Sequence, residues 1–169
     1  MAKGGKPGKA VGAAEVWKFG GASLADAGAV RRAASLVVAH RGPLLVVASA
    51  LAGVTDSLLD GAKRSASGDL DAGAEVALVL HKRHRLATEA LLPPGPARGR
   101  LIASLDGATR EYRDLCRAVA ALGDLSARAS DLLVSRGERL ASALLVAAIG
   151  VAGRRAVVVD ARLVVATDG

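Results

Sequence analysis

A lysine lies between two aromatic residues in the segment VWKFGGAS, which covers residues 16–23. The apolar residues predict a β-strand over residues 15–19, and Gly20 and Gly21 predict a tight turn directly after it. Burying an ammonium group is costly unless an anion accompanies it. Lys18 is therefore either a strand residue whose head reaches water or a cation aimed at a ligand. The glycines would let a phosphate approach the backbone closely, although any tight turn between a strand and a helix uses glycine.

Hydroxyl groups follow a second apolar segment, the valine-rich run over residues 44–49. Such a continuous run is typical of a strand that is covered on both faces. Ser49 and Thr55, in the segment SALAGVTD, can orient a small polar substrate. Thr55 followed by Asp56 is equally typical of an ordinary helix cap. The hydroxyls taken alone leave both interpretations open.

A carboxylate, Glu138, precedes the strongly apolar helical stretch of residues 140–151. An acidic side chain at a helix start interacts favourably with the helix dipole. Taken alone, Glu138 therefore has a structural explanation, and a role in binding needs further support.

Common motifs for nucleotide and metal binding are missing. The sequence contains neither G-x-x-x-x-G-K-[ST] nor G-x-G-x-x-G, the signatures of the P-loop and of the Rossmann dinucleotide site. His81 and His84 have the i, i+3 spacing of one helix face, but the Lys and Arg residues beside them oppose a cation. No Cys or acidic residue completes a ligand set with them. We expect both histidines at the surface and no metal site.

The elements that must position these residues form a β-α-β unit. The spacing of apolar residues predicts a helix over residues 24–40, beginning with a capping box formed by Ser23 and Asp26. A right-handed crossover makes the strands before and after this helix parallel, so both strands end at the same edge of the sheet. Ligands of open α/β sheets bind at that edge. The loops after the two strands should therefore lie together where an anion would bind.

Beyond residue 56 the sequence predicts mainly helices. These cover residues 55–65, 72–92, 100–122, 125–134 and 140–151, with a break at the PPGP segment of residues 93–96, and strands or turns follow near residues 156–159 and 160–165. The predicted fold class is α/β, a parallel-sheet β-α-β start followed by a large helical insertion. So few strands leave a sheet face and a sheet edge uncovered, which indicates the front portion of a longer protein.

Composition limits the class of protein. With 169 residues, 51% of them hydrophobic, the chain can form one globular domain with a core or part of a larger one. Lys and Arg number 23 against 16 Asp and Glu, and part of this excess lies in residues 1–14, which we expect to form a flexible basic tail. Aromatic residues make up only 2%, so the chain lacks stacking platforms for nucleic acid.

The single cysteine and the absence of a long apolar run indicate the environment. Cys116 has no partner for an intrachain disulfide, fits a reducing compartment, and falls in a helical pattern that predicts a buried side chain. No apolar run approaches the ~20 residues that cross a bilayer. We expect a soluble, cytoplasmic protein without a membrane partner.

Taken together, four segments in order, KFGGAS, SALAGVTD, SRGERLASALL and DARLVVATDG, resemble the aspartate kinases of the amino-acid-kinase superfamily. The resemblance implies that residues 15–169 are the N-terminal, incomplete part of an amino-acid-kinase domain. It implies transfer of the ATP γ-phosphoryl group to the side-chain carboxylate of L-aspartate, which gives 4-phospho-L-aspartate. This reaction leads to lysine, threonine and methionine.

The resemblance also implies roles for individual residues. Lys18 corresponds to the lysine that neutralises charge on the transferring phosphoryl group. The backbone of Phe19, Gly20, Gly21 and Ala22 corresponds to the phosphate-binding turn. Ser49 and Thr55 correspond to hydroxyl residues that hold the amino acid, and Glu138 to the acid that pairs with its α-ammonium group. Ala22 departs from the family, which usually has Thr or Ser there.

The implied ligands are ATP, L-aspartate and Mg²⁺, and the residues on the metal side are expected outside this chain. We therefore expect no ATP turnover by these 169 residues alone. The full-length protein is expected to be a homo-oligomer that binds no nucleic acid. Two alternatives stay open: another enzyme of the superfamily, acting on glutamate, carbamate or a nucleotide, and a non-catalytic binding or regulatory module of the same fold.

Overall fold

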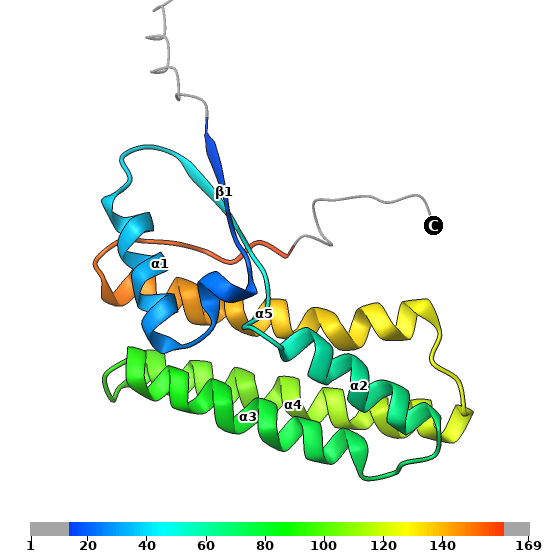
Figure 1. Cartoon of the computed structure of the whole chain (residues 1–169). Helices are drawn as coiled ribbons and strands as arrows, with labels where there is room; N and C mark the ends of the chain where they lie inside the picture. The colour runs from blue at the N-terminus through cyan, green and yellow to red at the C-terminus, as the bar shows by residue number, and fades with distance from the viewer. Residues whose placement is uncertain (1–13, 161–169) are drawn as a thin grey trace, which may run out of the picture.

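The computed structural model describes residues 14–160, in which a small sheet stands against a group of long helices (Figure 1). The elements are, in order, β1 (Glu15–Phe19), the 3-10 helix η1 (Gly21–Leu24), α1 (Ala27–Ala39), β2 (Leu44–Ala48), α2 (Val54–Ala66), α3 (Ala72–Leu91), α4 (Pro96–Leu122) and α5 (Ala127–Val151). Helices α2 to α5 pack on one another and α1 packs on α5, so the sheet and the helices share one core. The predicted α/β class with a helical insertion is confirmed.

The sheet consists of two parallel strands joined by α1, and β1 begins and ends where the sequence predicts. Lys18 lies beside Val47 in the register. Alternate residues of a strand point to opposite faces, so Phe19 is buried while Lys18 is exposed. Trp17 contacts Phe19 and His40 edge-on, with ring centroids 6.4 Å and 5.1 Å apart. The aromatic residues that flank Lys18 therefore belong to the inner face, and the lysine belongs to the outer one.

The prediction that residues 44–49 are covered on both faces is wrong for the part of the chain that the structure describes. In β2, Leu45 and Val47 are 53% and 47% exposed, while Leu44, Val46 and Ala48 are half-buried. The reason is that the core packs against only one face of this sheet.

Helix α1 begins at Ala27 rather than at residue 24. Its N-cap is Asp26, whose carboxylate accepts a hydrogen bond from Ala29 N at 2.8 Å, so Ser23 is not the cap. An Asp at the N-cap satisfies a free backbone amide by itself. The residues before it form η1, in which Ser23 N donates to Gly20 O at 2.9 Å.

One continuous helix, α5, replaces the two helices predicted over residues 125–134 and 140–151. A glycine inside a helix costs about 1 kcal/mol relative to alanine, and for this reason the pattern around Gly137 favours a break. Glu138 therefore lies inside α5 and not at the start of a helix. Helix α4 also differs from the prediction: it begins at Pro96 rather than at residue 100, because proline fits the first position of a helix.

No strand forms over residues 156–159, contrary to the prediction; within residues 14–160, β1 is the only strand that pairs with β2. Arg154 holds this segment near the end of α1 by donating to His40 O at 2.6 Å and Gly42 O at 2.8 Å. Residues 156–159 line a cavity together with Leu44 and Val46 of β2, but no backbone hydrogen bond within residues 14–160 joins the two segments, so they form no ladder. The rest of the strand or turn predicted over residues 160–165 lies, beyond Asp160, outside the described residues.

The helical part of the core is closely packed. Cys116 of α4 is buried, as predicted, where α4 meets Gly73 of α3. The buried hydroxyl of Tyr112 donates to Leu58 O at 2.8 Å and so joins α4 to α2. Among residues 14–160, none of the helices has the length and apolarity that crossing a membrane needs.

Candidate active site

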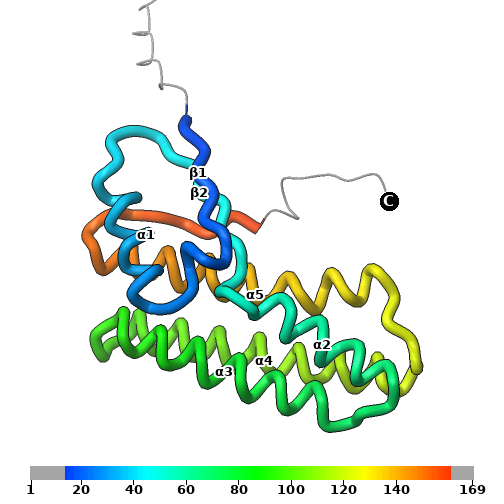
Figure 2. The backbone as a smooth tube through the Cα atoms, viewed as in Figure 1, coloured from blue at the N-terminus to red at the C-terminus, as the bar shows by residue number. Residues whose placement is uncertain are grey.

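The two loops that follow the strands lie together at one edge of the sheet. Ser49 N donates to Phe19 O at 3.0 Å, which extends the β1–β2 ladder past the end of β2. A side-chain carbon added to Gly21 would lie 3.4 Å from both Ala50 O and Ala52 Cα, so the glycine turn and the second loop are in van der Waals contact. Figure 2 traces both loops from the sheet into the helices.

A third segment, around Gly137 of α5, packs against the second loop. A side-chain carbon on Gly137 would lie 2.8 Å from Val54 Cγ1 and 3.0 Å from Ala50 Cβ, distances that leave no room for one. Only glycine lets α5 approach so closely. The residues next to these contacts in the sequence are Thr55 on α2 and Glu138 on α5, so the structure brings the segments that carry them into contact.

The predicted site side chains are accessible. Lys18, Thr55 and Glu138 are exposed and Ser49 is half-buried. Within residues 14–160, the side chains of the first three form no hydrogen bond or ion pair. Since Glu138 lies in the interior of α5, the helix dipole does not explain it, because that effect is confined to the terminal turns.

The other charged residues of the same motif have structural roles. Arg136 is buried, donates to Leu132 O within α5, and pairs with Glu111 of α4, with 3.4 Å between Nη2 and Oε2. Phe19 is likewise a core residue, so only its backbone is available at the predicted phosphate turn. Ala22 is exposed on η1.

Gly20 is a glycine that the fold itself does not require. Its φ of −76° and ψ of 174° are open to any residue, and a side-chain carbon there would meet no atom within 4 Å. Glycine is the residue found where another molecule must come close to the backbone. The space beside Gly20 therefore suits a ligand that contacts the backbone, such as a phosphate.

Arg83 of α3 is a residue that the sequence analysis missed. Its Nη1 donates to Ala52 O at 2.6 Å and its Nη2 donates to Ala25 O at 2.8 Å. In the sequence it is one of the charged residues beside His81 and His84. The available signal was helical spacing, since Arg83 lies three residues after Leu80 and four before Ala87, both buried.

The prediction that both histidines lie at the surface is wrong for His84, which is 3% exposed. Its Nδ1 donates to Leu80 O at 2.9 Å, and desolvation by burial lowers the pKa of the imidazole. His81 is half-buried and lies 2.7 Å from Asp106. The helical period explains the difference, because His84 lies one turn after Leu80 on the inner face of α3.

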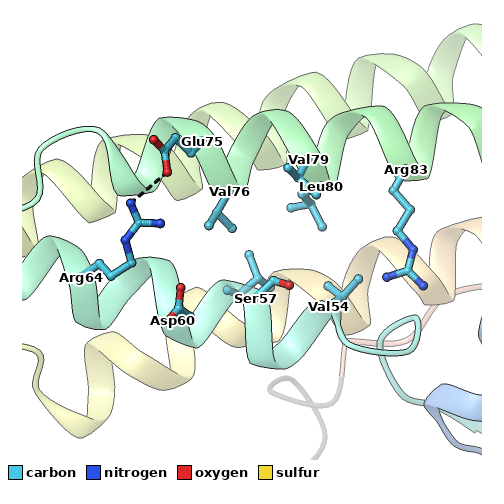
Figure 3. A pocket seen from close by; sticks show the side chains of 10 residues that line it. Val54, Ser57, Asp60, Arg64, Glu75, Val76, Val79, Leu80 and Arg83 are labelled. Carbon is cyan, nitrogen blue, oxygen red and sulfur yellow. Dashed lines mark hydrogen bonds and ion pairs between the residues drawn. The ribbon is translucent and has the colours of Figure 1, made fainter.

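A groove of about 230 Å³ lies between α2 and α3, with apolar side chains in its middle and the Arg64–Glu75 ion pair at one end (Figure 3). Its lining includes Val54, Arg83 and none of the predicted site residues. The site is therefore better defined by the chemistry at the sheet edge than by this cavity.

The described residues do not fit a protein-held Mg²⁺ site. Among residues 14–160, no group of three or more His, Cys, Asp or Glu side chains could hold a metal ion. The exposed Lys18 and the open glycine turn instead fit the phosphate groups of a nucleotide.

The sequence profile of the amino acid kinase family matches residues 15–168, and the chain belongs to this family. Among solved structures, it is similar to E. coli aspartokinase III in complex with aspartate and ADP (R-state), with 30% identity, a TM-score of 0.65, and coverage of 82% of this chain and 29% of that chain. It is also similar to E. coli aspartokinase III in complex with lysine and aspartate (T-state), with 28% identity, a TM-score of 0.64, and coverage of 79% and 28%. No curated protein matches the sequence.

These comparisons confirm the predicted resemblance and the amino-acid-kinase fold. The chain spans less than a third of the length of the solved relatives. The comparisons establish membership of the amino acid kinase family, and the activity and the substrate are separate questions.

Proposed function

We propose that this chain carries the amino-acid side of an aspartate kinase, which transfers the γ-phosphoryl group of ATP to L-aspartate. A side-chain carboxylate oxygen attacks the γ-phosphorus and forms the new P–O bond. The bond from that phosphorus to the β,γ-bridging oxygen breaks, and ADP leaves with the electron pair. The products are 4-phospho-L-aspartate and ADP, and no covalent intermediate with the protein is needed.

In this proposal the protein supplies charge and position. Lys18 offsets negative charge on the transferring phosphoryl group, and backbone amides of residues 19–22 donate to its oxygens. Ser49 and Thr55 hold the amino acid, and Glu138 pairs with its α-ammonium group. Fixing that end of the substrate directs the far carboxylate toward the phosphate, which sets the geometry of attack.

The observation that carries the proposal is the contact among three distant segments. The glycine turn touches the loop at Ala50 and Ala52, and that loop touches Gly137 of α5. These three segments carry the cation Lys18, the hydroxyl groups of Ser49 and Thr55, and the carboxylate of Glu138. Among the described residues, the side chain of Glu138 forms no hydrogen bond or ion pair. These groups match the charges of an amino acid and a phosphate.

Replacing Glu138 tests the proposal directly. In Glu138→Gln the ion pair with the α-ammonium group is lost, so L-aspartate should bind at least about tenfold more weakly, as expected for a charge-assisted hydrogen bond of about 1.5–3 kcal/mol. We would measure binding by calorimetry and by chemical-shift changes in the ¹⁵N-labelled chain.

Asp131→Asn is the matched control, because Asp131 is an exposed acid two turns earlier on the same helix. This variant should bind L-aspartate as the unchanged chain does. The unchanged chain and both variants should bind L-glutamate and L-asparagine more weakly than L-aspartate. Equal binding of L-aspartate by the Glu138→Gln and unchanged chains would refute the assignment, and preference for L-glutamate would favour another kinase of the family.

A further inference from the structure

Arg83 forms a bridge between the two loops of the candidate site. Its guanidinium group donates to Ala52 O at 2.6 Å and to Ala25 O at 2.8 Å, although these residues are distant from it in the sequence. Figure 3 shows the side chain extending from α3 toward the start of α2. A residue outside the site thus holds main-chain atoms of both loops.

The two hydrogen bonds of Arg83 lie beyond the end of the sheet, where the hydrogen-bond ladder between β1 and β2 no longer connects the two loops. The ladder between β1 and β2 ends at the hydrogen bond from Ser49 N to Phe19 O. Within the described residues, no backbone hydrogen bond joins residues 20–26 to residues 50–53. Beyond the ladder, the two loops are therefore connected by the van der Waals contact at Gly21 and by the two hydrogen bonds of Arg83.

We propose that Arg83 is a positioning residue, which sets the distance between the phosphate-side turn (residues 20–25) and the substrate-side loop (residues 49–55). This inference rests on the proposed function of the two loops. Arginine suits the role because its planar guanidinium group holds several N–H donors in a fixed geometry. Lysine has a single nitrogen on a flexible stem and cannot reproduce that geometry. Phosphoryl transfer is sensitive to such spacing, because reacting groups must be held close and aligned.

The experiment compares Arg83→Met, Arg83→Lys and Arg85→Met in the ¹⁵N-labelled full chain. Arg85→Met is the control, since Arg85 lies on the same helix and pairs with Glu89, away from the loops. The first readout is amide hydrogen exchange of Ser23 and Val54, whose amides donate within the two loops to Gly20 O and Leu51 O. The second readout is the affinity for L-aspartate.

We expect exchange at Ser23 and Val54 to accelerate at least tenfold in Arg83→Met and Arg83→Lys, while amides of the α4 core stay unchanged. The affinity for L-aspartate should fall at least fivefold in both variants and remain unchanged in Arg85→Met. Because the lysine variant keeps the charge and the stem, its failure to rescue would assign the effect to the paired donors.

The two readouts separate this inference from the proposed function. If the unchanged chain binds L-aspartate and the Arg83 variants bind it equally well, the positioning role is overturned and the proposed function stands. If no chain binds L-aspartate but exchange accelerates only in the loops, the bridge is supported and the proposed function fails. Acceleration throughout the helices would show that Arg83 serves stability alone, which overturns the inference.

Discussion

At the scale of single residues, Gly20 marks the place where a ligand can approach the backbone. Its dihedral angles suit any residue and the space beside it is open, so nothing within the described chain explains a glycine there. Lys18 is close in sequence and exposed on the outer sheet face. A cation beside an open glycine turn is the kind of arrangement that binds phosphate oxygens.

Gly20→Ala should therefore leave stability almost unchanged, within about 0.5 kcal/mol, and weaken binding of a phosphate ligand. The added methyl group would occupy the space of the phosphate without meeting any protein atom. We would titrate ADP into the ¹⁵N-labelled chain and follow the amides of residues 19–24, with urea unfolding as the stability measurement. Gly99→Ala, inside α4 and also without an atom within 4 Å, is the control for ADP binding, which it should leave unchanged. Unchanged ADP binding in Gly20→Ala would contradict a phosphate at this turn.

At the scale of elements, the crossing of α5 over the second loop decides where Glu138 lies. Gly137 is the contact point, because a side-chain carbon there would come within 2.8 Å of Val54 Cγ1. Arg136 secures the same turn of α5 to α4 through Glu111. The position of the carboxylate therefore depends on a close helix approach that any larger residue would disturb.

Gly137→Ala should lower stability despite the better helix propensity of alanine. Overpacking costs about 1–3 kcal/mol, and with Val54 Cγ1 only 2.8 Å from the added carbon this cost exceeds the gain of about 1 kcal/mol from the helix. Gly107→Ala, inside α4 with open space around it, should instead raise stability by about 0.5–1 kcal/mol. Chemical denaturation measures both. L-aspartate affinity should fall in Gly137→Ala only, and equal stabilisation by the two changes would show that α5 does not need this close approach.

At the scale of the whole molecule, a buried histidine links stability to pH. His84 lies in the helical core, and its burial lowers the pKa of its imidazole below the ordinary value near 6.5. The unfolded chain therefore binds a proton at His84 more readily than the folded chain does. Stability from this group is complete above about pH 6.5 and falls as the pH drops from there toward the lowered folded pKa.

His84→Asn should reduce this loss, because asparagine does not titrate and its amide can take the place of Nδ1 as a donor to Leu80 O. Urea unfolding between pH 5 and 7.5, followed by circular dichroism, should give a steeper pH dependence for the unchanged chain, by at most about 1.4 kcal/mol per pH unit. The ring resonances of His84 should titrate below pH 6.5 in the folded protein. Identical slopes in the two chains would contradict the prediction.

The sequence by itself determined the local elements and the chemistry they carry. Apolar runs and turn residues predicted β1 and the position of β2, and a crossover helix between them made the strands parallel, so the loops with Lys18 and Ser49 had to share an edge. These features depend on residues close in the chain, which is why a single sequence predicts them.

Only the tertiary structure decided how helices α2 to α5 contribute to the core and to the candidate site. It made α5 continuous through Gly137, buried His84, and set Arg83 across both loops. Each of these outcomes depends on partners far away in the sequence, such as Val54 for Gly137 and Ala25 for Arg83. Local propensity favoured a break at Gly137, and long-range packing outweighed it, because a glycine inside a helix costs only about 1 kcal/mol.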